Sequence, residues 1–119
     1  MPRLREQDRA LEALKAVQGL ASKKDAADYR QQFQQLPSRI LASGLGQTMA
    51  FSASKGGKEA EVAATVASFL LRRRASAIDL LGEIMSRPTT EYRARTREAL
   101  AYAEWLKRYA VALIEKREK

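Results

Sequence analysis

Residues 89–118 read TTEYRARTREALAYAEWLKRYAVALIEKRE and carry the longest helical pattern in the chain. Residues spaced three or four apart share one face of a helix. The face defined in this way is mostly small or apolar: Tyr92, Thr96, Ala99, Ala103, Leu106, Ala110 and Leu113. The pattern predicts a long C-terminal helix that begins at a Thr89 or Thr90 cap and ends near Glu118.

Three aromatic residues form a stripe beside this face: Tyr102, Trp105 and Tyr109. They widen the apolar arc, so the helix offers two surfaces that packing can cover. The rings either complete the core of the chain itself or contact a partner, and the pattern leaves both interpretations open.

The rest of the chain also has the composition of helices. Ala, Leu, Arg, Glu, Lys and Gln dominate, and alternating runs of β-branched residues are missing. We expect further helices at about residues 3–19, 22–36, 37–43, 45–54, 59–74 and 76–85. A chain of 119 residues is long enough for one modest core. The sequence therefore predicts one all-α domain over residues 1–119, a compact bundle of about six to seven helices.

Periodicity also predicts which side chains of the earlier helices face the core. Three sets have helical spacing: Leu4, Leu11, Leu14 and Gln18; Ala26, Tyr29, Phe33 and Leu36; Val62, Val66, Phe69 and Leu70. The short helix near residue 80 carries Ile78, Leu81 and Met85 at similar spacing.

Local signals mark where these helices begin and end. Ser22 and Ser76 each precede an aspartate by three residues, which is the spacing of a capping box. Pro37 suits the first turn of a helix, and Gly44 suits the left-handed position that follows one. The stretch SKGGK, residues 54–58, predicts a flexible loop.

The charge balance indicates a polyanionic partner. The chain has 22 Lys and Arg residues against 14 Asp and Glu, a net charge of +8, and no Cys or His. This charge favours nucleic acid or an acidic membrane surface. The missing Cys and His exclude a disulfide framework, a Cys/His zinc site and histidine acid–base chemistry. The sequence has no signal-peptide pattern and no membrane-spanning run, so we expect a cytoplasmic protein.

Three arginines lie at the start of the C-terminal helix, where positive charge is unfavourable. Arg93, Arg95 and Arg97 fall in its first two turns, where the helix dipole disfavours cations. Arg93 and Arg97 also repel each other at i, i+4. An anionic ligand relieves both penalties, so we expect phosphate contacts here, the alternative being a structural role. Further basic candidates are Lys107, Arg108, Lys55, Lys58 and Arg39.

Other basic residues have a simple explanation. Arg72, Arg73 and Arg74 close a helix, where cations favour the negative end of the dipole. Lys55 and Lys58 flank two glycines, and solvation alone accounts for them as well as a phosphate contact does.

Motifs for catalysis and cofactor binding are incomplete. SASK, residues 52–55, matches the S-x-x-K nucleophile signature but lacks its S-D-N and K-T-G companions. Met49 stands where G-x-G-x-x-G needs a third glycine, and Glu59 follows Lys58 where a phosphate loop needs Ser or Thr. No D-x-D or E-x-x-H pattern offers a metal site. We therefore expect a binding subunit without catalytic residues, cofactor or metal.

The stretch LPSRILASGLGQTMAF, residues 36–51, resembles the signature of the small all-α subunit of type III-B CRISPR effector complexes, the fifth protein of the Cmr set. The matching residues are Leu36, Pro37, Gly44, Leu45, Gly46, Gln47, Thr48, Met49, Ala50 and Phe51. Residues 92–112 are similar to the closing helix of that family, including Glu98-Ala-Leu100 and Trp105-Leu-Lys107-Arg108. One departure is Ser43, where relatives often carry Asn.

The resemblance implies a function in antiviral defence. Such subunits are non-catalytic, and several copies stack into a minor filament beside the backbone subunits that hold the guide RNA. The implied partners are the backbone and large subunits, further copies of this chain, and the duplex of guide and target RNA. No membrane and no small-molecule substrate is implied. Because guide pairing supplies the sequence specificity, phosphate contacts suffice for such a subunit.

Each part of the signature has an expected place. Gly44 ends one helix, and Gly46 allows close approach at the start of the next. Met49 and Phe51 point to the core and to a neighbour. The polar pair, Gln47 and Thr48, either contacts a partner subunit or RNA, or holds the turn together.

Two other functions compete with the resemblance. A stand-alone DNA-binding regulator is the main alternative, with residues 37–55 as a helix-turn-helix. A helical hydrolase would use Ser52 and Lys55 as nucleophile and base.

Overall fold

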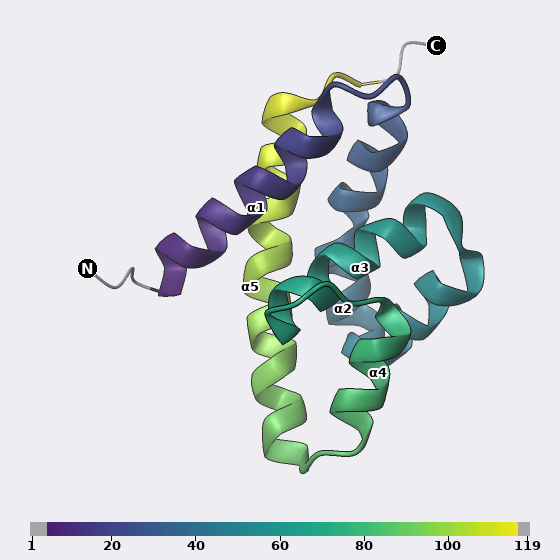
Figure 1. Ribbon diagram of the computed structural model, residues 1–119, viewed down its shortest axis with the longest axis vertical. Coiled ribbons are helices and arrows are strands. Elements are labelled where there is room, and N and C mark those ends of the chain that lie inside the picture. Colours follow the sequence, from purple (N-terminus) through teal and green to yellow (C-terminus); the bar gives the residue numbers. More distant parts are fainter. Residues whose placement is uncertain (1–4, 117–119) are drawn as a thin grey trace.

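The computed structural model describes residues 5–116 and shows five helices and no strand in that range (Figure 1). The helices are α1 (Arg5–Ala21), α2 (Ala26–Lys55), α3 (Gly57–Leu71), α4 (Ala77–Met85) and α5 (Thr89–Leu113). The predicted all-α class is confirmed, whereas the predicted count of six to seven helices is too high. The predictions for Leu4 and Glu118 lie outside the described residues.

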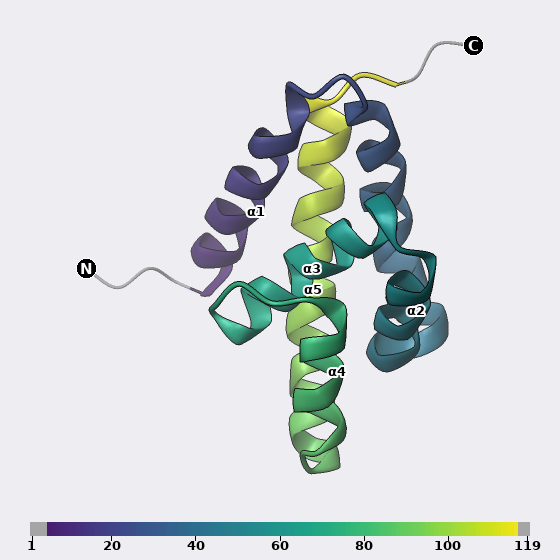
Figure 2. The same cartoon turned by 45° about the vertical axis from the view of Figure 1, so that its right-hand side comes forward.

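The long helix α5 is the central element. It has α1 and α2 on its two sides, and α4 lies beside its first half (Figure 2). Tyr102 of α5 stacks on Phe69 of α3 with ring centroids 4.0 Å apart. Trp105 and Tyr109 pack against the same core. The aromatic stripe therefore packs on the core of this chain, while Trp105 and Tyr109 remain half-buried and a partner contact through them stays a prediction.

The predicted inward faces are correct for α2 and α3. Their eight residues, Ala26, Tyr29, Phe33, Leu36, Val62, Val66, Phe69 and Leu70, are all buried. In α1 the buried residues are Ala13 and Val17, while Gln18 is exposed. In α4, Ala77, Leu80 and Ile84 face the core, so Ile78 and Met85 remain exposed. Both faces of α4 are apolar, so spacing alone does not select the one that packs.

Pro37 does not begin a new helix, because α2 passes through it. A proline inside a helix removes one hydrogen bond and costs about 3 kcal/mol. Phe33, Leu36 and Ile40 are buried on either side of Pro37. Each such side chain contributes about 1.5–3 kcal/mol on burial, which offsets the cost. The two predicted helices at 22–36 and 37–43 are therefore one.

The predicted loop at residues 54–58 is wrong. Lys55 ends α2 and Gly57 begins α3, so a single residue separates the two helices. Gly56 and Gly57 have φ values of +68° and +55°, in the region where glycine is strongly favoured. The two glycines form a sharp corner in place of a loop.

One of the predicted caps is confirmed. The Asp79 N–H donates to the Ser76 hydroxyl at 3.1 Å, and the Ser76 N–H donates to the Asp79 carboxylate at 2.9 Å. The capping box at Ser22 is wrong, since α2 begins after Asp25 without a side-chain cap. The threonine cap of α5 is also wrong, because the helix begins after Pro88. The helix ends at Leu113, earlier than the predicted end near Glu118.

Candidate nucleic-acid interface

Two glycines of the signature segment make a break in α2 possible. Gly44 has φ +85° and ψ 163°, a backbone conformation that is almost confined to glycine. The prediction that one helical segment ends at Gly44 is confirmed. The conformation differs from the expected left-handed helical one, because ψ is extended.

The break frees the N–H of Gly46, which an unbroken helix would hold in its own ladder. This N–H donates to the hydroxyl of Tyr92 in α5 at 2.9 Å. A Cβ at Gly46 would lie 2.4 Å from Met85 Cε and 3.1 Å from the Tyr92 hydroxyl oxygen. The predicted close approach at Gly46 is confirmed, and Tyr92 is the partner that sequence reasoning missed. We call Gly44, Gly46 and Tyr92 the glycine joint.

The remaining signature residues divide between the core and a groove. Leu36, Pro37, Leu45 and Met49 are buried. A groove of about 530 Å³ opens beside the joint, and its lining residues are Arg39, Ser43, Gln47, Thr48 and Phe51. We call it the signature groove. Its floor and walls come from both sides of the break at Gly44.

Several predicted phosphate-binding residues have partners within the chain. Arg39 donates to the side-chain oxygens of Gln32 and Gln35 at 2.9 Å and 2.5 Å. The ammonium of Lys58 lies 3.0 Å from a carboxylate oxygen of Asp25. These contacts hold both cations in place, although neither side chain is fully buried.

Arg95 compensates its unfavourable position by a contact with another helix. Its Nη1 donates to the carbonyl of Leu70 at 2.5 Å, in the last turn of α3. Cations are favourable at that end of a helix. The penalty at the start of α5 is therefore offset, and Arg95 has a structural role.

Three other arginines have no such partner. Arg93, Arg97 and Arg108 are exposed and share one face of α5. None of them makes an ion pair or hydrogen bond within residues 5–116. Lys107 beside them is half-buried. The unfavourable interaction with the helix dipole, and the mutual repulsion of Arg93 and Arg97, are therefore not offset by a contact within the described residues.

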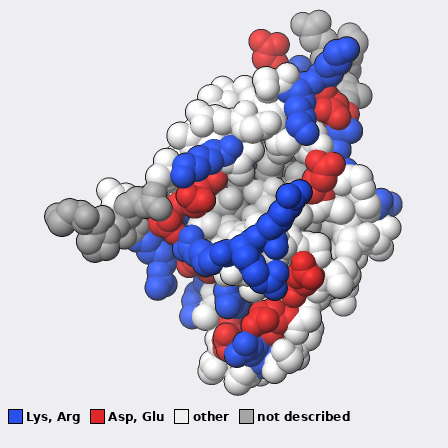
Figure 3. Space-filling view, in the orientation of Figure 1, with Lys and Arg blue, Asp and Glu red and all other residues white. Residues whose placement is uncertain are grey.

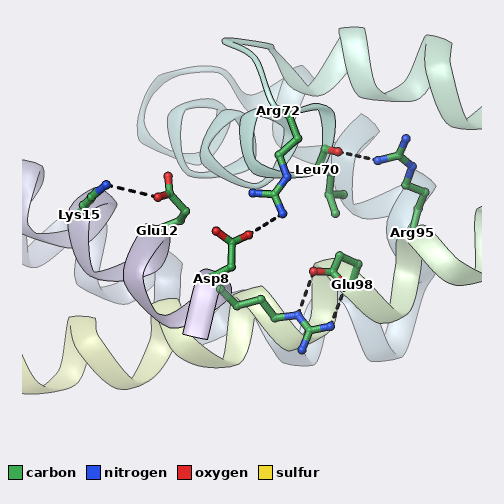
Figure 4. A network of polar contacts seen from close by, with 8 residues as sticks. Asp8, Glu12, Lys15, Leu70, Arg72, Arg95 and Glu98 are labelled. Carbon is green, nitrogen blue, oxygen red and sulfur yellow. Dashed lines mark hydrogen bonds and ion pairs between the residues drawn. The ribbon is translucent and has the colours of Figure 1, made fainter. Parts of the chain in front are cut away.

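A polar network fixes α1 against the other helices (Figure 4). The guanidinium of Arg9 donates to both carboxylate oxygens of Glu98 at 2.9 Å and 2.7 Å. This pair holds the pKa of Glu98 below its usual value. Arg72, at the end of α3, donates to Asp8 at 2.6 Å. The network therefore joins α1 to α3 and to α5.

The surface charge is locally mixed. Figure 3 shows Lys and Arg side chains gathered across the middle of one face, with carboxylates beside them. The excess of cations over the whole chain, +8, nevertheless leaves a surface suited to polyanions.

Two chemistries considered from sequence motifs, a metal site and a serine nucleophile, find no support among the described residues. Within residues 5–116 no group of three or more acidic, His or Cys side chains could hold a metal. Ser52 is 2% exposed, so its hydroxyl is inaccessible to a substrate, and Lys55 lies against the ring of Phe51. Among the same residues, no helix is long and apolar enough to cross a membrane.

Comparison with known proteins identifies the family. The model of the CRISPR-associated protein family Cas_Cmr5 matches residues 5–113. This chain belongs to the Cmr5 family. A curated relative, the CRISPR system Cmr subunit Cmr5 of Thermus thermophilus, is 36% identical over 118 residues, which cover 95% of this chain and 98% of the relative. The crystal structure of a Cmr5 family protein from the same organism matches with a TM-score of 0.87 at 34% identity, over 95% of this chain and 100% of that one.

The geometry fits a Cmr5 family member better than a DNA-binding regulator. Residues 37–55 belong to one bent helix, with a single residue, Gly44, at the bend. A helix-turn-helix has a turn of several residues and presents its second helix to the bases. Met49, on the segment that would read bases, is buried.

Proposed function

We propose that this Cmr5 family chain is the non-catalytic small subunit of a type III-B RNA-guided effector complex in the cytoplasm. Its copies stack into the minor filament, in contact with the backbone and large subunits. In this position it contacts the duplex of guide and target RNA through phosphates. Family membership and the net charge of +8 support the proposal.

The observation that carries the RNA contact is the pair Arg93 and Arg97. Both are exposed near the start of α5, where the dipole and their mutual repulsion disfavour them. Arg95 between them is compensated by Leu70, whereas they have no partner within residues 5–116. An RNA phosphate would supply the missing negative charge. Arg108 continues the same face.

This mode of binding predicts little sequence preference, because phosphate contacts carry no base information. The chain is expected to bind RNA of unrelated sequences with similar affinity, and that affinity should fall steeply with salt. Fluorescence anisotropy with several RNAs at graded salt measures both properties. Strong preference for one palindromic DNA site would contradict the proposal.

Membership of the complex is tested separately. A tagged copy of the chain, expressed with the other Cmr subunits and a guide RNA, should recover both guide and subunits after purification. Recovery of the chain alone, from cells in which the rest of the complex assembles, would contradict the proposed assembly.

A further inference from the structure

The signature groove contains an aromatic ring, that of Phe51, with two cations close to it. Phe51 is 43% exposed, which is unusual for so large an apolar side chain. The Arg39 guanidinium carbon lies 5.4 Å from its ring centroid, and the Lys55 ammonium lies 5.6 Å from it. An exposed ring with adjacent cations is the arrangement with which proteins bind single-stranded nucleic acid.

The two cations differ in how firmly they are held. Arg39 is oriented by Gln32 and Gln35, and its nearest carboxylate oxygen, on Glu59, is 4.0 Å away. Lys55 is exposed and makes no ion pair within residues 5–116. Lys55 can therefore move from the ring when a flat group arrives, while Arg39 stays in position.

The two polar side chains next to Phe51 differ in their access to a ligand. Thr48 lines the groove and is 2% exposed, and its hydroxyl makes no hydrogen bond within the described residues. Buried hydroxyls almost always have a partner. The adjacent Gln47 is exposed, and its amide offers both a donor and an acceptor.

We propose that the signature groove binds one unpaired nucleotide of RNA. The base stacks on Phe51, the phosphate lies near Arg39 and Lys55, and the exposed amide of Gln47 bonds to polar atoms of the nucleotide. A nucleotide fits because a single unit carries both a flat ring and a negative charge. An acidic peptide would satisfy the cations but would leave the exposed ring without a stacking partner. The inference rests on the proposed RNA-binding function and adds to it a subsite away from Arg93 and Arg97.

The test uses the full chain and two probes: a short oligouridylate that carries 5-iodouridine, and the same strand annealed to its complement. Phe51→Leu keeps apolar bulk but removes the stacking face. It should weaken binding of the single strand about tenfold, within the range known for base–aromatic stacking. Binding of the duplex should change less than about twofold. Leu41→Ala, at a 71% exposed position of the same helix, is the control and should change neither affinity.

Two further measurements separate this site from a merely structural role. Irradiation of the 5-iodouridine probe should crosslink it to Phe51, as mapped by mass spectrometry. Thr48→Val removes the buried, unpartnered hydroxyl, so it should raise the melting temperature of the free chain and leave single-strand binding unchanged, which makes it a control for effects of stability alone.

Each failure has its own meaning. If the wild-type chain binds neither probe, the proposed RNA-binding function fails. If Phe51→Leu leaves single-strand affinity unchanged while Arg93→Gln with Arg97→Gln reduces it, RNA binding stands and the nucleotide site is refuted. If Phe51→Leu affects only retention in the Cmr complex, the groove binds protein, which also refutes the site.

Discussion

Replacing Tyr92 by Phe removes one oxygen atom from the glycine joint and keeps the aromatic ring. The Gly46 N–H, which donates to the Tyr92 hydroxyl at 2.9 Å, then loses its only partner in the described part of the chain. Gly46 is buried, so water replaces the hydroxyl poorly. The variant therefore leaves a buried donor unsatisfied without a change in shape.

The expected cost follows from that donor. An unsatisfied buried polar group costs about 1–3 kcal/mol, and Tyr92 is itself only half-buried, so we expect about 1–2 kcal/mol. The entropy of unfolding is roughly 2.1 cal/mol/K per residue. For 119 residues the melting temperature should therefore fall by about 4–8 °C.

Two measurements check this prediction. Urea unfolding followed by circular dichroism gives the free energy of unfolding, and amide hydrogen exchange reports on Gly46 directly. The control is Tyr109→Phe, which keeps the ring that stacks on Trp105 with centroids 5.6 Å apart. The Tyr109 hydroxyl makes no hydrogen bond within residues 5–116, so this variant should change stability by less than about 0.5 kcal/mol.

Equal stability of Tyr92→Phe and Tyr109→Phe would contradict the role assigned to the Tyr92 hydroxyl. A destabilised Tyr92→Phe variant whose Gly46 amide exchanges at the wild-type rate would contradict that role as well. In either case the hydroxyl of Tyr92 would not be what holds the two halves of α2 against α5.

Three further predictions concern other parts of the molecule. Gly44→Ala should destabilise the chain by about 1–3 kcal/mol in urea unfolding, because Gly44 has a φ of +85°. Gly19→Ala should instead stabilise the chain by up to about 1 kcal/mol, because no atom lies within 4 Å of the added Cβ. Because Arg9 lowers the pKa of Glu98, their pair contributes stability above the unfolded pKa near 4.5, and this is lost as pH falls through the folded pKa. Glu98→Gln should therefore lose about 1–2 kcal/mol at pH 7 and show a flatter acid limb in pH-dependent unfolding; an unchanged limb would mean that the pair is unimportant. Ser52→Ala should leave target-RNA cleavage by the assembled complex unchanged, and a large loss would restore the hydrolase hypothesis.

Periodicity and composition were sufficient to predict the helical class and the packed faces of α2 and α3. Ala26, Tyr29, Phe33 and Leu36 repeat at helical spacing with polar residues between them, so only one face could be buried. In α4 the apolar residues nearly surround the helix, and its neighbours decided that Leu80 packs and Ile78 does not. Local signals failed where tertiary packing outweighed them, as at Pro37.

In the candidate site, too, local sequence predicted some features, while others depend on residues far apart in the chain. The glycines of the signature predicted a break and a close approach, since only glycine tolerates both. Their partner was out of reach of sequence reasoning, because Gly46 and Tyr92 are 46 positions apart in the chain. The same holds for Arg95, whose compensating carbonyl at Leu70 lies on another helix. The helix dipole marked three arginines at the start of α5 as unusual. The fold shows that Arg95 is compensated by a contact within the chain, whereas Arg93 and Arg97 are not compensated within the described residues.

The most direct test of the proposed function is the salt dependence of RNA binding by a variant with Arg93→Gln and Arg97→Gln. Each lost phosphate contact lowers the slope of log Kd against log salt concentration by about 0.7–0.9, so the double variant should lower it by about 1.4–1.8. The control, Lys23→Gln with Lys24→Gln, removes the same charge at the α1–α2 connection, at the opposite end of α5 (Figure 1), and should leave the slope unchanged. Equal slopes for the two double variants would contradict the assignment of Arg93 and Arg97 as the phosphate-binding pair.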